Sequence, residues 1–170
     1  MRALSLFASF VLLLSTGSAL SQPLTPDEVI SSVKTKGPKI TVDEIWSSQA
    51  SANQFLAGVR SAEPRWLGVA KPLASGTDAG ASEELSDAIS VALLKCPYQL
   101  LPWLKDTWWK GSQTACLFGY DSELPGGVKS YIGKLSYSLR KQAPENLEPL
   151  RQECLRGLEE TRADLKAANK

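Results

Sequence analysis

The chain has 170 residues, with 19 basic and 18 acidic residues, three cysteines and no histidine. A formal net charge of +1 argues against nucleic acid and anionic membrane surfaces as partners, because both require a clustered excess of lysine and arginine. Without histidine, the chain cannot carry out Ser-His-Asp or Cys-His catalysis and cannot hold zinc or haem through imidazole. No P-loop or dinucleotide-binding glycine motif is present, so we expect neither a cofactor nor a metal.

Residues 1–19 have the pattern of a secretory signal peptide. Arg2 precedes a short apolar run, and small residues then allow cleavage after Ala19 or after Ser21. The apolar run is too short to span a bilayer of roughly 30 Å, which argues against a membrane anchor. We therefore expect an exported protein, in the periplasm or, as the alternative, in the extracellular space. Its single helical domain is expected to cover residues 25–168.

The mature chain begins with two capping boxes. "TPDE" at 25–28 places Pro26 at the first helical position, and "TVDE" at 41–44 repeats the box. Apolar residues recur at spacings of three and four behind each box. Pro64 opens a further helix, which Pro72 should end because proline removes a backbone donor. These patterns predict helices over the first half of the chain.

Two polar loops interrupt the middle of the chain. "ASGTDAGA" at 74–81 is rich in turn-forming residues, and Ser82 then begins a strong helix that ends near Cys96. Prolines divide the next stretch into short helical pieces. "FGYDSELPGG" at 118–127 is the second loop.

Two longer amphipathic helices complete the chain, over 128–139 and 147–165. The second of them carries opposite charges three residues apart, which predicts ion pairs on a solvated face. The predicted pairs are Glu148 with Arg151, Glu153 with Arg156, and Glu159 with Arg162.

The fold class that follows is all-α, because no segment shows the alternation of a β-strand. We expect a single domain of about six to seven helices. The spacing groups them into helical hairpins over 41–73, 82–109 and 128–168. Such hairpins stack as an irregular orthogonal bundle or as a short α-solenoid-like array.

Three cysteines in an exported protein allow one disulfide and leave one thiol. A bridge from Cys116 to Cys154 would contribute about 4 kcal/mol, and a bridge from Cys96 to Cys116 about 3 kcal/mol. Cys154 falls on the apolar face of its helix, which slightly favours the first pairing. Cys96 would then be a buried free thiol.

The first polar loop is a candidate partner-binding segment. Asp78 and Gly80 can set a tight turn, and Ser82 can cap the following helix. A loop of this kind can present backbone donors to an anion or to an acidic group of a partner. Helix capping alone explains the same residues, so Asp78 and Ser82 are candidates with a structural alternative.

Three tryptophans crowd the stretch "LPWLKDTWWKGSQTAC". Trp108 continues an apolar helical line and is expected in the core. Trp103 and Trp109 do not share its face and are expected at the rim, near the second loop with Asp121. We therefore regard Trp103, Trp109 and Asp121 as candidate partner-binding residues, although a mainly structural cluster is the favoured interpretation.

Carboxylate chemistry is the enzymatic mechanism that the composition still permits, because glycoside hydrolysis needs two acids that flank a bond. The candidate acids surround the two loops: Asp78, Glu83, Glu84, Asp106, Asp121 and Glu123. A tryptophan-lined cleft beside two of them would suit a glycan. Turn formation, helix capping and solvation account for the same acids, so we do not expect an enzyme.

The segment Glu63 to Leu101, "EPRWLGVAKPLASGTDAGASEELSDAISVALLKCPYQLL", resembles a pattern in uncharacterised exported α-helical proteins of Gram-negative bacteria. In these proteins a "WL-VA--L" helix precedes a "DAG/S-E-L" loop and a second helix that ends in "NP". The resemblance implies a periplasmic setting and assigns no reaction. It also implies that Cys96, in "CP", is a local replacement, which makes the pair of Cys116 and Cys154 the expected bridge.

These features together predict a non-enzymatic interaction protein of the cell envelope. It would act as an inhibitor, an immunity protein or a chaperone-like partner of another periplasmic or secreted protein. The alternative is a protein that binds or cleaves peptidoglycan or another glycan.

Overall fold

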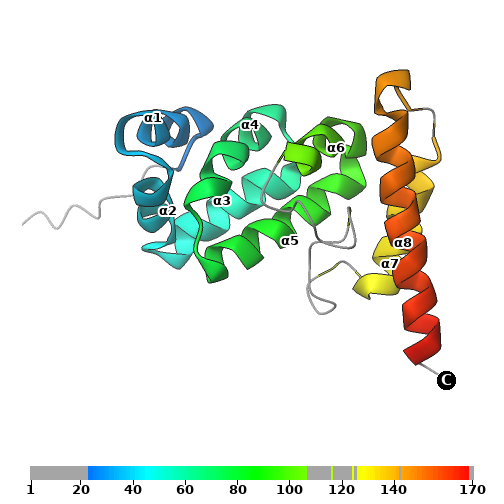
Figure 1. Ribbon diagram of the computed structural model, residues 1–170. Helices are drawn as coiled ribbons and strands as arrows, with labels where there is room; N and C mark the ends of the chain where they lie inside the picture. The colour runs from blue at the N-terminus through cyan, green and yellow to red at the C-terminus, as the bar shows by residue number, and fades with distance from the viewer. Residues whose placement is uncertain (1–22, 107–115, 117–123, 125, 142, 169–170) are drawn as a thin grey trace, which may run out of the picture.

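The protein is built from helices in the residues that the computed structural model describes, which are 23–106, 116, 124, 126–141 and 143–168 (Figure 1). These residues contain no β-strand, which confirms the all-α class. They form eight α-helices and two short 3₁₀-helices: α1 (Pro26–Lys36), α2 (Pro38–Trp46), α3 (Gln49–Ser61), α4 (Pro64–Leu73), η1 (Ala74–Gly76), α5 (Ala79–Lys95), α6 (Pro97–Asp106), α7 (Gly127–Leu139), η2 (Glu145–Leu147) and α8 (Glu148–Ala168).

The capping box at the start of α1 is confirmed. The Thr25 hydroxyl accepts the Glu28 N–H at 3.3 Å, and the Glu28 carboxylate accepts the Thr25 N–H at 2.9 Å. Pro26 occupies the first helical position, where its missing N–H costs nothing.

The "TVDE" stretch is not a helix start, contrary to the sequence-based prediction. α2 already begins at Pro38, after Gly37 with a φ of 85° that favours glycine. Thr41 therefore lies inside α2, where its hydroxyl donates to the Gly37 carbonyl at 2.9 Å. A separate helix, α3, starts where Ser48 accepts the N–H of Ser51. These interruptions explain why the chain has more helices than predicted.

The start of α5 also differs from the prediction, because Asp78 and not Ser82 is its N-cap. The Asp78 carboxylate accepts the Ala81 N–H at 2.9 Å. The Ser82 N–H donates to the Asp78 carbonyl at 2.9 Å, as the first regular bond of the helix. A carboxylate is also favoured at this end of a helix by the helix dipole.

Consecutive helices pack as pairs, as predicted for hairpins in series. The pairs α3–α4, α5–α6 and α7–α8 are each in contact, and α1–α2 forms a further pair before them. α3 packs along α5, and α7 packs on α5 and α6. Figure 1 shows the α7–α8 hairpin across the end of the bundle opposite α1. One hydrophobic cluster extends through the described residues, from Val29 in α1 to Leu158 in α8.

α8 is held to the rest of the bundle by a narrow stripe. Its buried residues are Cys154, Gly157 and Leu158, and none of the residues 159–168 is buried. The structure places Cys154 at disulfide distance from Cys116, with the two Cα atoms 5.4 Å apart. This is the pairing that the sequence favours, and Cys96 is the free cysteine, half-buried rather than buried as expected.

Hydrogen bonds also tie the connection between α7 and α8 to α6. The Tyr98 hydroxyl approaches the carbonyl oxygens of Leu139 at 2.8 Å and Lys141 at 2.9 Å. Arg151 donates to the Leu139 carbonyl at 3.2 Å and also binds the Glu148 carboxylate. The hydrogen bonds from Arg151 hold the pKa of Glu148 well below its usual range, at about 2. The top of the hairpin is therefore fixed to the bundle.

Two glycines permit close approach of helices. η1 brings Gly76 against the start of α2, where a Cβ on Gly76 would overlap backbone atoms of Pro38 and Lys39. In α3, a Cβ on Gly58 would overlap the ring of Trp66 from α4. At both positions the packing of the folded chain therefore favours a residue without a Cβ.

We expect Gly76→Ala to lower the free energy of unfolding by about 1–3 kcal/mol, because the atoms that a methyl group would meet belong to rigid backbone. Urea denaturation followed by circular dichroism measures this loss. Gly68→Ala is the matched control, because a Cβ there meets nothing within 4 Å in an exposed position of α4. An equal response of the two variants would contradict the close contact between η1 and α2.

Removing the bridge by the double change Cys116→Ala and Cys154→Ala should cost about 4 kcal/mol, since the bridge spans a separation of 38 residues. Urea denaturation under non-reducing conditions measures the difference. Cys96→Ala is the control and should change stability by no more than about 1 kcal/mol, because Cys96 is half-buried and outside the bridge. A larger loss for Cys96→Ala than for the double variant would contradict the pairing.

Candidate functional site

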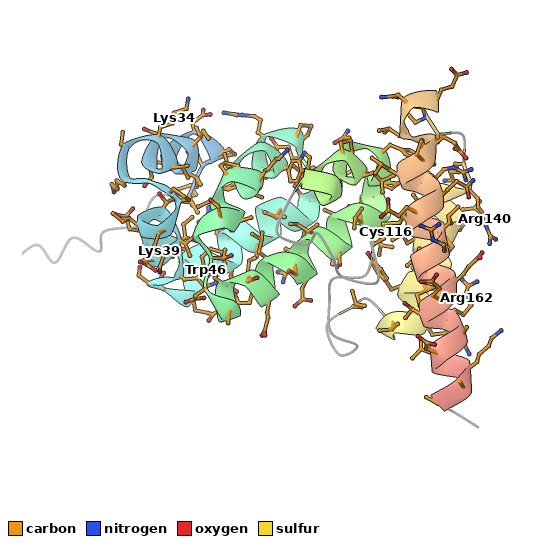
Figure 2. All side chains as sticks on the ribbon, viewed as in Figure 1. Lys34, Lys39, Trp46, Cys116, Arg140 and Arg162 are labelled. Carbon is orange, nitrogen blue, oxygen red and sulfur yellow. A yellow bond between two sulfur atoms is a disulfide. The ribbon has the colours of Figure 1, made fainter. Side chains whose placement is uncertain are left out.

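A groove of about 540 Å³ lies between the first half of α7 and the second half of α8. Arg162, one of its lining residues, lies on α8 at the end of the molecule opposite α1 (Figure 2). Its described lining residues are Val128, Lys129, Ile132 and Gly133 from α7, and Arg162, Leu165 and Lys166 from α8.

The floor of the groove is apolar and rigid. Val128 and Ile132 lie one turn apart on α7 and are 8% and 1% exposed. Both belong to the hydrophobic cluster, and Leu165 of α8 packs against that cluster while half-buried. The floor therefore keeps its shape without a ligand, because its side chains are held from behind by the core.

The rim of the groove is positively charged. Lys129 and Lys166 are exposed and Arg162 is half-buried. The described lining contains no acidic residue, and none of the ion pairs found among the described residues involves these three cations. With three cations and no acid in its described lining, the groove favours anionic groups over cationic ones.

Gly133 leaves the middle of the groove open. It lies inside α7, where glycine costs roughly 1 kcal/mol relative to alanine. A Cβ on Gly133 would meet nothing within 4 Å, so neither packing nor a positive φ requires glycine here. Gly58 and Gly76 differ from Gly133, because a Cβ at either of them would overlap other residues of the chain. A glycine that faces an open groove permits a ligand to approach the helix backbone.

The described lining of the groove consists of apolar residues, a glycine and cations. Its described lining carries no carboxylate, thiol, hydroxyl or imidazole that could act as a nucleophile or a general acid. It combines apolar surface with guanidinium and ammonium groups, a combination whose chemistry suits an amphipathic anion. No group of acidic or cysteine side chains that could hold a metal ion occurs in the described part of the chain.

The predicted site residues of the first loop lie elsewhere, at the start of α5. Asp78 and Ser82 help to line a shallow site of about 380 Å³. Because the Asp78 carboxylate occupies the helix N-terminus and accepts the Ala81 N–H, it competes with any external anion for these donors. Of the acids beside this loop, Glu84 accepts a hydrogen bond from the Trp46 indole at 3.0 Å, which joins α5 to α2.

The residues predicted around the second loop can be placed only in part. Trp103 is half-buried and packs against the hydrophobic cluster from α6. Trp109, Asp121 and Glu123 lie outside the described residues, as does the side chain of Asp106. Trp103 is not among the described lining residues of the shallow site that Asp78 and Ser82 share.

A buried tyrosine holds the segment before α7. Tyr131 donates a hydrogen bond to the carbonyl of Cys116 at 3.1 Å and is fully buried. Burial raises the pKa of Tyr131, and the neighbouring Ser90 hydroxyl lowers it by a smaller amount. The phenol therefore remains a protonated donor at neutral pH and has a structural role.

The groove was missed in the sequence because its members look ordinary there. The apolar residues of the floor match the expected core stripes of the two helices, and Arg162 was assigned to an ion pair with Glu159. In the structure Glu159 instead pairs with Arg140 at 3.6 Å, which leaves Arg162 at the groove. Of the three predicted pairs in α8, Glu148 with Arg151 alone is formed among the described residues. Gly133 within a strong helical pattern was the signal that could have indicated the site.

No protein-family model matches this sequence, and no curated protein and no solved structure matches it either. Among the described residues, no helix combines the length and the apolar character needed to cross a membrane.

We expect Gly133→Ala to raise the free energy of unfolding by about 0.5–1 kcal/mol, because the methyl group enters open space and alanine favours the helix. Urea denaturation measures the gain, and Gly68→Ala should give a gain of similar size for the same reason. Destabilisation by Gly133→Ala alone would show that a neighbour in the folded chain fills the groove at this point.

Proposed function

We propose that this is an exported interaction protein that binds another envelope or secreted protein through the groove between α7 and α8. It acts without catalysis, as an inhibitor, an immunity protein or a chaperone-like partner. The observation that carries this proposal is the open apolar groove with Lys129, Arg162 and Lys166 at its rim and no compensating acid in its described lining. An apolar surface with cations at its rim is typical of a protein-binding site.

Two features support export to the periplasm. The pattern of residues 1–19 is that of a signal peptide. Cys116 and Cys154 lie at disulfide distance, which suits an oxidising compartment.

The alternative of glycan binding gains no support from the groove. Sugar rings stack on aromatic faces, and glycan cleavage needs a pair of acids. The described lining of the groove has neither an aromatic side chain nor a carboxylate. Its cations favour an anionic surface, which many proteins offer, over a neutral sugar.

The proposal is tested by charge reversal at the rim. We expect the tagged wild-type protein to recover a stoichiometric protein partner from an envelope extract of the native host. The double variant Arg162→Glu and Lys166→Glu should recover about tenfold less, because it turns an attractive rim into a repulsive one. Affinity purification with quantitative mass spectrometry measures the recovery.

The matched control reverses two other exposed lysines, Lys34 in α1 and Lys71 in α4, which leaves the net charge equal to that of the rim variant. It should recover the partner like the wild type. Equal recovery by all three proteins would contradict the assignment of the groove. If the protein sediments with purified peptidoglycan in the absence of any partner protein, the glycan alternative is supported instead.

A further inference from the structure

We infer that the occupant of this groove is an amphipathic helix with an acidic face, supplied by the partner protein and seated against α7 at Gly133. The inference rests on the proposed function and specifies the chemistry of the partner. It is carried by three independent features of the groove: its charge, its place between two helices and its open glycine.

Charge selects an acidic partner. Lys129 rises from α7, and Arg162 and Lys166 rise from α8, so cations line the groove from both sides. Glu159, one turn before Arg162, pairs with Arg140 at 3.6 Å and does not pair with Arg162 in the described residues. Acidic side chains along both edges of a bound segment would therefore find partners, whereas basic ones would be repelled.

The form of the groove selects a helix among the usual forms of a bound peptide. A peptide that adds as a β-strand needs the edge of a sheet, and the described residues contain no strand. A polyproline segment needs a groove lined with aromatic rings, and the described lining has none. A seam between two packed helices instead accepts the apolar stripe of a third helix, with residues spaced three and four apart.

Gly133 allows that third helix to come close. Helices approach most closely where one of them carries a residue without a Cβ. Gly133 is exposed, and nothing in the described chain lies within 4 Å of its missing Cβ. One turn further along α7, Tyr137 is 69% exposed and lies on the same side of the helix. An incoming helix would thus contact Val128 and Ile132 at one end and Tyr137 at the other.

The probe for this inference is a fluorescein-labelled peptide of about 18 residues, which spans roughly 27 Å as a helix. It carries leucines at spacings of three and four, flanked on both sides by glutamates. The first matched peptide replaces every glutamate by lysine, and the second scrambles the acidic sequence. Fluorescence anisotropy at low ionic strength and at about 0.15 M gives the affinities, and circular dichroism reports helix formation on binding.

The acidic peptide should bind and gain helical signal, and the lysine and scrambled peptides should bind about tenfold more weakly. Charge reversal at Arg162 and Lys166 should weaken the acidic peptide by about tenfold, and the reversed pair Lys34 and Lys71 should have no such effect. Gly133→Leu fills the groove and should weaken binding about fivefold or more. Gly68→Leu, the matched change at an equally open helical glycine, should leave the affinity unchanged.

Several results would overturn the inference. Equal binding of the acidic and scrambled peptides, or binding unaffected by Gly133→Leu, would mean that charge alone attracts the peptide. If phosphatidylglycerol vesicles bind through Arg162 and Lys166 and the peptide does not bind, the occupant of the groove is an anionic lipid surface and not a helix. Circular dichroism of each variant checks that the fold is intact, and Gly133→Ala serves as a second, stabilised variant.

The failure of this inference can be told from the failure of the proposed function. If charge reversal abolishes recovery of the partner from the envelope extract but the acidic peptide does not bind, the groove binds a partner surface other than an acidic helix. If charge reversal affects neither the partner nor the peptide, the groove is not the interaction site at all.

Discussion

The attachment of the α7–α8 hairpin to the bundle determines the architecture at the end of the molecule opposite α1. α7 contributes Tyr131, Leu135 and Leu139 to the core, all fully buried, and thereby contacts α5 and α6. α8 contributes only a narrow stripe around Cys154 and Leu158. The link from Cys154 to Cys116, together with the hydrogen bonds of the connecting turn, compensates for this small contact. A helix held in this way keeps a defined position while most of its surface stays free.

The groove between α7 and α8 follows from the way in which the hairpin is attached to the bundle. The hairpin is fixed at its closed end, where Arg151 and Tyr98 bind the carbonyl of Leu139, and through the stripe around Cys154 and Leu158. The second half of α8 has no buried residue, and α7 is the α-helix with which α8 makes its most extensive contact among the described residues. A groove therefore opens between the two helices, and Ile132 and Leu165 are among its described lining residues. Apolar surface that is fixed in position and left uncovered is the property that supports a role in binding.

Local signals in the sequence predicted much of the fold. The capping box at Thr25 and the apolar stripes of the two last helices were sufficient for the all-α class and for the order of the hairpins. The errors arose where two local signals competed. Pro38 after Gly37 starts α2 ahead of Thr41, and Asp78 caps α5 ahead of Ser82. In both cases the earlier residue nucleates the helix, and the later one becomes part of its first turns.

By itself the sequence determined the all-α class and the lack of imidazole chemistry, because these depend on composition and on neighbours along the chain. It also predicts export, through the signal-peptide pattern of residues 1–19. The sequence could not distinguish a leucine of the core from a leucine of a groove, since both occupy the same apolar stripe. Only the tertiary structure decided that Val128, Ile132 and Leu165 line a groove between α7 and α8. It also decided that Glu159 pairs across the hairpin with Arg140, which leaves Arg162 free to define the charge of the site. The physical reason is that burial and charge pairing depend on distances between residues far apart in the chain, which local periodicity does not contain.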